Sequence, residues 1–465
     1  MSEVLDLPAI TTVPLGELLT DIRNGLVVEQ EKELPGIPIT RIETISKGTV
    51  DMDRVRYVRD TAGKSLDNFW LKKGDILFSH INSDLHLGKT ALVLSDAPLL
   101  HGMNLLRLRV DSSRLRPKYL HHWLDYCRRT GVFMAIAQHA VNQSSLNQKK
   151  ITSLEVPLRS VCEQDEIVAE LEKQFSRLDE AVANLQRVKA NLKRYKASVL
   201  KAAVEGRLVE TEATLAHREG RPYETGEQLL QRILDERRAK WTSKGKYKEP
   251  ATLDAIPETE SPEGWTWCNF EQVSISERNA LKAGPFGSAL KKEFYVPVGY
   301  KIYGQEQVIA GDHKFGDYYI TEEKYRELEN CAVKPGDILV SLVGTTGKVL
   351  VLPEGAEKGI INPRLIKLSL NPKFVAAQYA SYYLQSAPAR SFFKLQAHGG
   401  TMEILNLGIV KALPVCLPPM AEQTRIVAEV DRHLSIIREV EAEVDANLKR
   451  AQALRQATLA KAFSA

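Results

Sequence analysis

Apolar residues recur at seven-residue spacing in two segments of the chain. The first segment, from Glu163 to Val204, contains no proline or glycine, and its stripe consists of Leu171, Leu178, Leu185 and Leu192. The second segment carries the matching stripe Val430, Ile437 and Val444. A helix with one apolar stripe and charged remaining faces needs a partner helix. We therefore expect two long helices, over 159–206 and 418–465, that pack on each other as an antiparallel coiled coil.

The segments before these helices, 1–158 and 263–417, have a different pattern. Short apolar runs bounded by glycine and proline, such as GDILFSHI and GDILVSLVG, are typical of strands. The run PKYLHHWLDYCRRTGVFMAIA, residues 117–137, has the spacing of one helix packed on a sheet. Each segment is therefore predicted to be a mixed α and β domain. The residues between the halves, 207–262, are predicted to be a polar connector with one short amphipathic helix, TGEQLLQRILDERRAKW.

The two halves of the chain repeat each other. Glu163-Gln164 and Ile167-Val168-Ala169-Glu170 recur 259 positions later as Glu422-Gln423 and Ile426-Val427-Ala428-Glu429. His139 matches His398 in the same way, and Gly74-Asp75-Ile76-Leu77 matches Gly336-Asp337-Ile338-Leu339. A repeat this long is not a solenoid unit but a duplicated domain with its helix. The expected fold is α+β, with two globular domains related by a pseudo-twofold repeat and separated by the helix pair.

Composition narrows the class of protein without identifying it. A net charge of +4 fits a nucleic-acid partner but does not require one. The five cysteines are scattered and never in CxxC spacing, which indicates a reducing compartment and no structural zinc. No run approaches 18 apolar residues, so we expect a cytoplasmic protein that does not span a membrane.

The sequence contains fragments of catalytic motifs but no complete one. Gly88-Lys89-Thr90 resembles the end of a phosphate-binding loop, but Ser83 stands where that loop requires glycine. In the second copy, Gly347-Lys348 is followed by Val349, which lacks the hydroxyl that would bind magnesium. No catalytic residue and no metal site is predicted. His139 and His398 are each interpreted either as buried supports of a loop or as partner contacts.

The polar loops differ between the two copies, although the strands agree. Asn and Gln side chains can bond adenine edges, Arg and Lys can read guanine, and Lys can hold phosphates. In the first copy the candidate DNA contacts are Arg41, His80, Asn82, His86, Lys89, Asn104, Asn142 and Gln143. In the second copy they are Lys282, Ser288, Lys291, Lys292, Gln305, Gln307, Thr345, Thr346, Lys348, Arg364, His398 and Thr401.

Several of these motifs, in this order and each present twice, resemble the specificity subunit of Type I restriction-modification enzymes. They are the strands LKKGDIL and VKPGDIL, the helix starts EQDEIVAE and EQTRIVAE, and the helix ends YKASVLKAAVEGRL and LRQATLAKAF. The connector that leads into SPEGWTW is similar as well. The resemblance covers almost the whole chain.

The resemblance implies that 1–158 and 263–417 are target-recognition domains, each reading one half of a split, asymmetric sequence in double-stranded DNA. It implies that the helices set the spacer and that the chain has no catalysis of its own. Two methyltransferase subunits would bring S-adenosylmethionine, and two motor-nuclease subunits would bring ATP and Mg, so this chain would bind no cofactor. Two alternatives remain open: a cytoplasmic coiled-coil scaffold without DNA sequence specificity, and a degenerate nucleotide-binding enzyme.

Overall fold

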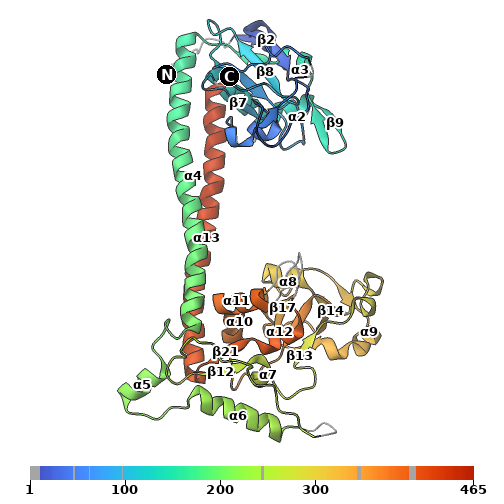
Figure 1. Cartoon of the computed structure of the whole chain (residues 1–465), viewed down its shortest axis with the longest axis vertical. Coiled ribbons are helices and arrows are strands. Elements are labelled where there is room, and N and C mark those ends of the chain that lie inside the picture. The colour runs from blue at the N-terminus through green and yellow to red at the C-terminus, as the bar shows by residue number, and fades with distance from the viewer. Residues whose placement is uncertain are drawn as a thin grey trace, which may run out of the picture. The chain divides into compact units, whose positions relative to one another are not determined.

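The chain divides into two compact units. The computed structural model describes residues 11–45, 48–61, 63–96, 98–241, 246–342, 347–396 and 405–464. Unit 1 consists of Met1–Arg187 with Val444–Ala465, and unit 2 consists of Val188–Glu443 (Figure 1). This division differs from the five consecutive segments predicted from the sequence, because each long helix contributes one part to each unit.

An antiparallel four-stranded sheet forms the centre of unit 1. Its strand order is β2 (Leu19–Asn24), β8 (Leu106–Val110), β5 (Ile76–Phe78) and β7 (Thr90–Leu92). Helix α1 (Pro117–Arg129) packs on β7. The sequence predicted one helix over 117–137, but Gly131 has a φ of 82° and separates α1 from α2 (Val132–Ile136). A left-handed glycine ends a helix at no steric cost, and the apolar spacing alone does not reveal this break.

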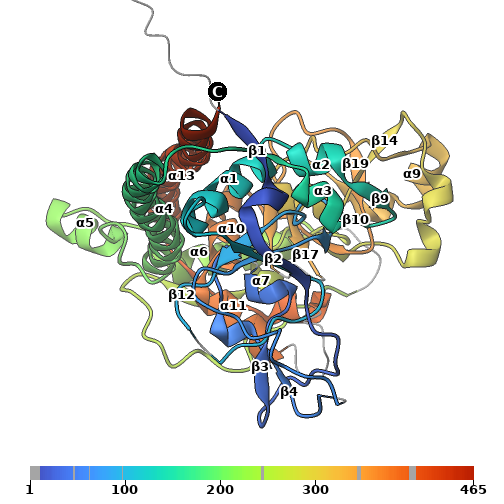
Figure 2. The same ribbon diagram turned by 90° about the horizontal axis from the view of Figure 1, so that it is seen from above.

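Smaller elements surround this sheet in unit 1. Strand β1 (Thr12–Pro14) pairs with β11 (Glu155–Pro157), and β3 (Ile37–Ile39) pairs with β4 (Arg56–Val58), visible as a ribbon in Figure 2. Strands β6 (Ile81–Asn82), β10 (Gln143–Ser145) and β9 (Gln138–Ala140) form a third sheet in that order. The remaining short elements are α3 (Gln148–Thr152) and the 3-10 turns η1 (Leu15–Leu18), η2 (Ile42–Ile45) and η3 (Met52–Arg54).

Unit 2 contains an equivalent central sheet. Its order is β13 (Leu281–Ala283), β20 (Leu365–Leu368), β17 (Ile338–Ser341) and β18 (Val349–Val351), again antiparallel throughout. Helix α10 (Ala377–Gln385) packs on β18 as α1 packs on β7. Strand β12 (Thr266–Asn269) pairs with β21 (Pro414–Leu417), as β1 pairs with β11. The short elements are α7 (Phe270–Val273), α11 (Ala387–Gln396), α12 (Leu407–Ala412), η4 (Gly287–Ala289) and η5 (Lys292–Phe294).

A second sheet is larger in unit 2 than in unit 1. Its order is β15 (Tyr319–Ile320), β14 (Tyr300–Tyr303), β19 (Gly359–Ile361) and β16 (Ala332–Val333), with β14 and β19 parallel. It is accompanied by α8 (Gln305–Ala310), α9 (Glu322–Glu327) and η6 (Glu329–Cys331). In unit 1 the same pairings are isolated bridges: Leu100 pairs in parallel with Ile39 and antiparallel with Trp70.

The same buried glutamine joins a long helix to its domain in each unit. Gln164 accepts a hydrogen bond from the Arg116 backbone N–H (2.7 Å), and its amide nitrogen donates to the carbonyls of Arg114 and Arg159 (both 2.9 Å). Gln423 makes the same three kinds of bond with the backbone of Ala376, Phe374 and Pro418. Since both glutamines are fully buried, they hold the start of the long helix against the start of α1 or α10.

The long helices are α4 (Val161–Val204) and α13 (Met420–Phe463), and their antiparallel packing is confirmed within each unit (Figures 1 and 2). In unit 1, Asp179 of α4 lies 2.6 Å from Arg455 of α13, and Gln174 lies 3.3 Å from Thr458. In unit 2, the Tyr195 hydroxyl lies 2.9 Å from His433. A residue later on α4 therefore contacts a residue earlier on α13, as Asp179 and Gln174 show in unit 1, so the two helices are antiparallel.

The predicted apolar stripes are buried to different degrees. On α13, Val430, Ile437 and Val444 are all buried, and on α4 Leu171 is buried while Leu178, Leu185 and Leu192 are half-buried. The helix ends enter the domain cores: Leu459 and Phe463 join the core of unit 1, and Val199 and Leu200 join that of unit 2. None of the helices in the part of the chain that the structure describes is long and apolar enough to cross a membrane.

The connector contains two helices where the sequence predicted one. The predicted helix is α6 (Gly226–Ala239), which begins with a capping box at Thr225. The additional helix is α5 (Glu212–Glu219), capped by the Thr211 side chain and ended by Gly220 with a φ of 65°. Its eight residues are mostly polar, so the apolar spacing gave no signal. The buried Glu212, which binds Arg425 of α13 (2.6 Å), fixes the start of α5 within unit 2.

Candidate nucleic-acid interface

All described candidates of unit 2 except Gln305 and Gln307 gather at one end of its central sheet. In an antiparallel sheet, neighbouring strands run in opposite directions, so the end of β13, the start of β20, the end of β17 and the start of β18 meet. Lys282 lies on β13, Ser288, Lys291 and Lys292 follow it, Arg364 precedes β20, and Lys348 precedes β18. We call these segments, 284–292, 362–364 and 347–348, the loop end of unit 2.

The candidates of unit 1 other than Arg41 lie at the equivalent end of the other sheet. His80, Asn82, His86 and Lys89 occupy the connection from β5 to β7, and Asn104 precedes β8. The hairpin of β9 and β10, with Asn142 and Gln143 at its turn, joins this region because β10 pairs with β6. We call 25–28, 79–89 and 101–104, with this hairpin, the loop end of unit 1.

Strand register makes the two loop ends equivalent residue by residue. Ile76 pairs with Leu108, which pairs with Ile22, and Ile338 pairs with Leu368, which pairs with Leu281. Counting from these positions, Gly25 corresponds to Gly284, Asn104 to Arg364 and Lys89 to Lys348. Of these three pairs, the letters alone reveal Lys89 with Lys348, whereas the match of Asn104 with Arg364 needs the strand register.

Two glycines confirm this register through the same close approach. A Cβ atom on Gly25 would lie 1.8 Å from the carbonyl oxygen of Gly102, and one on Gly284 would lie 1.8 Å from that of Asn362. Gly25 N–H bonds to the Leu105 carbonyl (3.3 Å), and Gly284 N–H bonds to the Leu365 carbonyl (2.9 Å). Only glycine allows the chain leaving β2 or β13 to press this closely against the neighbouring turn. Each loop end is thus a tightly built frame.

The candidates of unit 1 are uncharged amides and histidines for the most part. Asn142 and Gln143 are exposed, and Asn142 and Asn104 both have left-handed backbones with φ of 63° and 68°. Asn82 is half-buried, and its amide donates to the Ser79 hydroxyl (3.0 Å). Arg41 is half-exposed and lies 3.7 Å from Glu43. The outermost groups of this loop end are therefore amides that can both donate and accept hydrogen bonds.

Three histidine candidates of unit 1 differ in their surroundings. His80 is buried, and this burial lowers its pKa to about 4, so its imidazole is uncharged near neutral pH. Nδ1 of His80 and Nδ1 of the half-buried His86 are buried without a hydrogen-bond partner among the described residues. His139 supports the hairpin, with Nδ1 2.8 Å from the Ser144 hydroxyl, yet its side chain is half-exposed. Its match His398 lies outside the described residues.

Lys89 borders a basic cleft within unit 1. The cleft has a volume of about 940 Å³, and the charged residues around it are Asp125, Asp179, Lys89, Arg128, Arg129, Lys449 and Arg455. Burial, with a smaller contribution from Arg128, lowers the pKa of Lys89. Both Arg128 and Arg129 bind Asp125, and Arg455 binds Asp179. The two carboxylates therefore hold three of the cations in place.

The candidates of unit 2 are more cationic. Ser288, Lys291, Lys292, Lys348 and Arg364 are exposed, and Lys282 is half-buried. Lys291 lies 3.5 Å from Glu293 at the surface, where water weakens the attraction. Thr345, Thr346 and Thr401 lie outside the described residues. At equivalent positions, unit 2 thus presents Arg364 where unit 1 presents Asn104, whereas Lys348 and Lys89 are the same residue in both units.

Two candidates of unit 2 face inward. Gln307 is fully buried: its side-chain oxygen accepts from the Gly304 N–H (2.8 Å), and its amide donates to the Phe315 carbonyl (2.8 Å). Gln305 is also buried. Thr44, at the place of Gln307 in unit 1, accepts from the Arg41 N–H in the same way (2.9 Å). Gln307 therefore supports the turn after β14, and its amide is not directed at a ligand.

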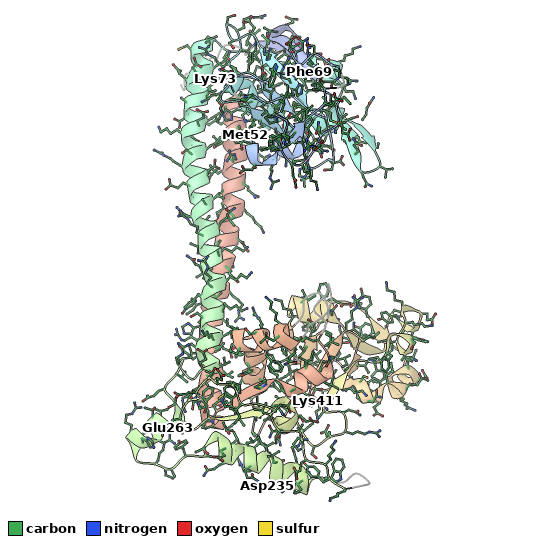
Figure 3. The ribbon with its side chains drawn as sticks, in the orientation of Figure 1. Met52, Phe69, Lys73, Asp235, Glu263 and Lys411 are labelled. Carbon is green, nitrogen blue, oxygen red and sulfur yellow. The ribbon has the colours of Figure 1, made fainter. Side chains whose placement is uncertain are left out.

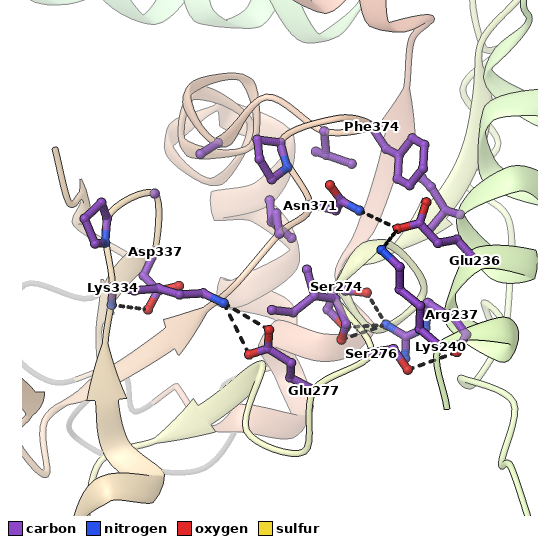
Figure 4. Close-up of a pocket in the computed structure, with 18 of the residues that line it drawn as sticks. Glu236, Arg237, Lys240, Ser274, Ser276, Glu277, Lys334, Asp337, Asn371 and Phe374 are labelled. Carbon is purple, nitrogen blue, oxygen red and sulfur yellow. Dashed lines mark hydrogen bonds and ion pairs between the residues drawn. The ribbon is translucent and has the colours of Figure 1, made fainter. Parts of the chain in front are cut away.

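The opposite end of the unit 2 sheet holds a cleft of about 740 Å³ beside α6 (Figure 4). Several of its polar groups bind each other: Lys334 binds Glu277 (3.1 Å), Asn371 binds Glu236 (3.1 Å), and Arg237 donates to the Ser274 hydroxyl (2.8 Å). Nearby, Lys411, labelled in Figure 3, pairs with Glu271 (3.2 Å). The bonds of Glu236 and Arg237 hold α6 of the connector against the rest of unit 2.

Sequence reasoning overlooked two apolar residues at the loop ends. Phe286 and Val27 are both exposed. The letters contained a signal, since GPFGS places an aromatic residue between two glycines in a polar segment, but only the polar neighbours were selected.

The chain is similar to known proteins over most of its length. Residues 282–450 match the family model of the Type I restriction modification DNA specificity domain. The putative type I restriction enzyme MjaX specificity subunit of Methanocaldococcus jannaschii is 28% identical over 420 residues, which are 89% of this chain and 84% of that protein. The type I restriction enzyme EcoKI specificity subunit of Escherichia coli is 30% identical over 162 residues, 34% of each chain.

A solved structure has the same fold. It comes from work on complex assembly and conformational transition of the type I R-M system, and it matches 97% of each chain with a TM-score of 0.63 and 17% identity. The α+β architecture with two long helices predicted from the sequence is therefore confirmed.

Proposed function

We propose that this chain, which belongs to the family of type I restriction-modification specificity subunits, reads a two-part DNA sequence, with one half of the sequence recognised at each loop end. Membership of the family makes DNA recognition the role of the chain. We assign the two halves of the DNA sequence to the two loop ends, and the spacer between the halves to the helix pair.

One observation supports this assignment above the others. Two sheets of equal order and register present loops at the same end, held by the same close approach at a glycine, yet with different polar groups at equivalent positions such as Asn104 and Arg364. If the loop ends were catalytic, the same catalytic side chains would be expected in both copies, or in one copy with their loss in the other. Equal frames with unlike outward groups suit two binding sites that recognise different sequences.

The polar groups indicate how each half would be read. Exposed Asn142 and Gln143 can bond an adenine edge with two hydrogen bonds. Exposed Arg364 can bond guanine, and Lys291 and Lys292 can neutralise phosphates. The first half of the site would then be read mainly through amides, and the second through cations.

We further propose that the chain is not catalytic and binds no cofactor. Two methyltransferase subunits would supply S-adenosylmethionine, and two motor-nuclease subunits would supply ATP and Mg. The buried and half-buried apolar stripes would keep the helix pair together as the docking surface for these partners. The five free cysteines support a reducing, cytoplasmic location. Neither a scaffold nor a degenerate nucleotide-binding enzyme gains support from the comparisons.

The decisive experiment selects DNA from a random pool with the chain in complex with its methyltransferase partner. The expected result is two short sequence blocks at a fixed separation. Asn104→Ala and Arg364→Ala form a matched pair, because they occupy equivalent positions of the two units. Each should relax a different block and leave the other unchanged, at about 1–3 kcal/mol for each base that is no longer recognised. A pool without sequence preference would refute the proposal.

A further inference from the structure

Each loop end exposes one large apolar side chain at the same place. Phe286 of unit 2 is 89% exposed, and Val27 of unit 1 is 59% exposed. Single exposed apolar residues are common on proteins and need no explanation alone. Here the strand register that aligns Gly25 with Gly284 also aligns Val27 with Phe286, two positions further on. The duplication has therefore kept an apolar side chain facing solvent in both copies.

The backbone around each of these residues is held firmly. The chain leaves β13 through Gly284, whose close approach to Asn362 fixes its path, and the Ala289 N–H then bonds to the Phe286 carbonyl (2.8 Å). In unit 1 the ammonium group of Lys64 donates to the Val27 carbonyl (2.6 Å). The main chain is thus tied to the domain while the side chain points outward. Because the backbone is already ordered, only the side chain has to be ordered when it meets a partner.

The surroundings of Phe286 favour nucleic acid over protein as that partner. The same loop carries Lys291 and Lys292, and the adjacent turn carries Arg364, all exposed. An apolar docking site for a protein is expected to have apolar neighbours, whereas a ring among cations suits a polyanion with stacked bases. Apolar wedges flanked by basic residues pack against base steps in many DNA-bending proteins.

We propose that Phe286, and Val27 at the equivalent place of unit 1, are apolar wedges that pack against a base step of the bound DNA and loosen its stacking. This inference rests on the proposed function, since it assumes that the loop ends meet DNA. The wedge would contact DNA without a hydrogen bond. It would favour a base step that unstacks easily, so it would contribute to sequence preference through DNA deformability.

The test uses the full chain in complex with its methyltransferase partner and the duplex that this parent complex selects. Phe286→Ala should weaken binding about tenfold, whereas Phe286→Trp should keep most of the affinity, because stacking tolerates any large ring. The dependence of binding on salt concentration should not change, because no charge is removed. Val298→Ala is the control, since Val298 is an equally solitary apolar residue of unit 2, 83% exposed, before the start of β14.

A second measurement reports the wedge directly. With 2-aminopurine placed in turn along the half-site, the parent complex should raise its fluorescence at one step, and Phe286→Ala should abolish the rise. Equal affinity and equal fluorescence for Phe286→Ala and the parent would overturn the inference while leaving the proposed function intact. The inference would also be overturned if Phe286→Ala weakened binding of the methyltransferase partner, while the complexes that still assembled bound DNA as tightly as the parent. A parent complex without sequence preference would instead refute the proposed function.

Discussion

Units 1 and 2 share their frame but differ in what the frame presents. Both use a buried glutamine to hold the long helix, and both use a glycine at a close approach of two backbone segments to hold the loop end. Yet Asn104 in one turn corresponds to Arg364 in the other. The difference teaches that the groups that fix the backbone face inward and are shared, whereas the groups that face solvent are free to diverge.

The aspartate of the two GDIL strands keeps its role in both units, although the side chain that binds it changes. Asp75 accepts from the Lys72 N–H (2.8 Å) and binds Arg109 with two bonds of 2.7 and 2.8 Å. Asp337 accepts from the Lys334 N–H (2.9 Å), but a serine, Ser369, takes the place of the arginine. Burial raises the pKa of Asp337. The turn is the same, although its charge balance differs.

The largest predicted effect tests whether the two units depend equally on the helix pair. Ile437→Asp places a charge at a position that is 2% exposed and should lower the free energy of unfolding by about 4 kcal/mol. Its neighbour Ile436 is 45% exposed, so Ile436→Asp should change stability by less than about 0.5 kcal/mol. Leu178→Asp, at a half-buried position, should fall between them.

Denaturant titration would measure these changes in the free energy of unfolding, and hydrogen exchange would show which unit is destabilised. Ile437 belongs to unit 2, so the amides of β17 and β20 should lose protection first. Val444→Asp, in the part of α13 that belongs to unit 1, should instead affect β5 and β8 first. Equal effects on both units from either substitution would contradict the division into two units.

The next prediction tests the equivalence of the two glutamines. Gln164→Ala and Gln423→Ala each leave one N–H and two carbonyls without their partner, so each should destabilise its own unit by about 3 kcal/mol. Gln186→Ala, on the exposed face of α4, is the control and should cost less than about 0.5 kcal/mol. Thermal unfolding with hydrogen exchange measures both. If only one of the buried glutamines mattered, the two helix junctions would not be equivalent.

The same comparison explains how much of the fold could be predicted from the sequence. Seven-residue spacing revealed both long helices to within two residues at each end, because a helix stripe is a local pattern. The repeat revealed the paired domains, because Gln164 and Gln423 are the same residue in both copies and make the same hydrogen bonds to the backbone. Gly131 and the polar helix α5 were missed, since a helix break by one glycine and a short capped helix leave no apolar period.

The candidate site was only partly predictable for a related reason. Letters alone selected Gln307 as a DNA-binding residue, but its amide is turned inward to cap the turn after β14. Phe286 was not among the predicted DNA contacts, because the exposure of its ring depends on the path that Gly284 imposes on the loop. Whether a polar side chain faces solvent or the backbone is decided by tertiary packing, which a single sequence does not show.

A third prediction concerns the cations that distinguish the loop end of unit 2. Replacing Lys291 and Lys292 by Ala should weaken DNA binding and reduce the slope of log K against log salt by about 0.9 for each phosphate that is no longer neutralised. Lys373→Ala is the control, since Lys373 is exposed but lies beyond the opposite end of β20. Binding measured from low to moderate salt checks this. An unchanged slope would show that these lysines do not touch phosphates.

The smallest predicted effect separates the two helix-start glutamates, which have the same letter but different surroundings. Glu163 is exposed, and its bonds to Ser160 lower its pKa. Glu422 is buried, where it accepts from the Trp265 indole (2.9 Å) and the Glu212 N–H (2.9 Å). Burial is the larger influence on Glu422 and raises its pKa, although these hydrogen bonds oppose the shift.

The two glutamates should therefore affect stability in opposite directions as pH changes. A raised folded pKa means that folding favours the protonated form of Glu422, so its contribution is fully present below the unfolded pKa and is lost as pH rises through the folded pKa. Relative to the parent, Glu422→Gln should become more stable from about pH 4 to pH 7, by about 1.4 kcal/mol for each unit of the shift. Glu163 has a lowered pKa, so its contribution is present above the unfolded pKa and is lost as pH falls. Glu163→Gln should accordingly become less stable relative to the parent over the same rise in pH. Melting temperatures of both variants across this range would decide it: parallel curves would mean that the buried and exposed glutamates are equivalent after all.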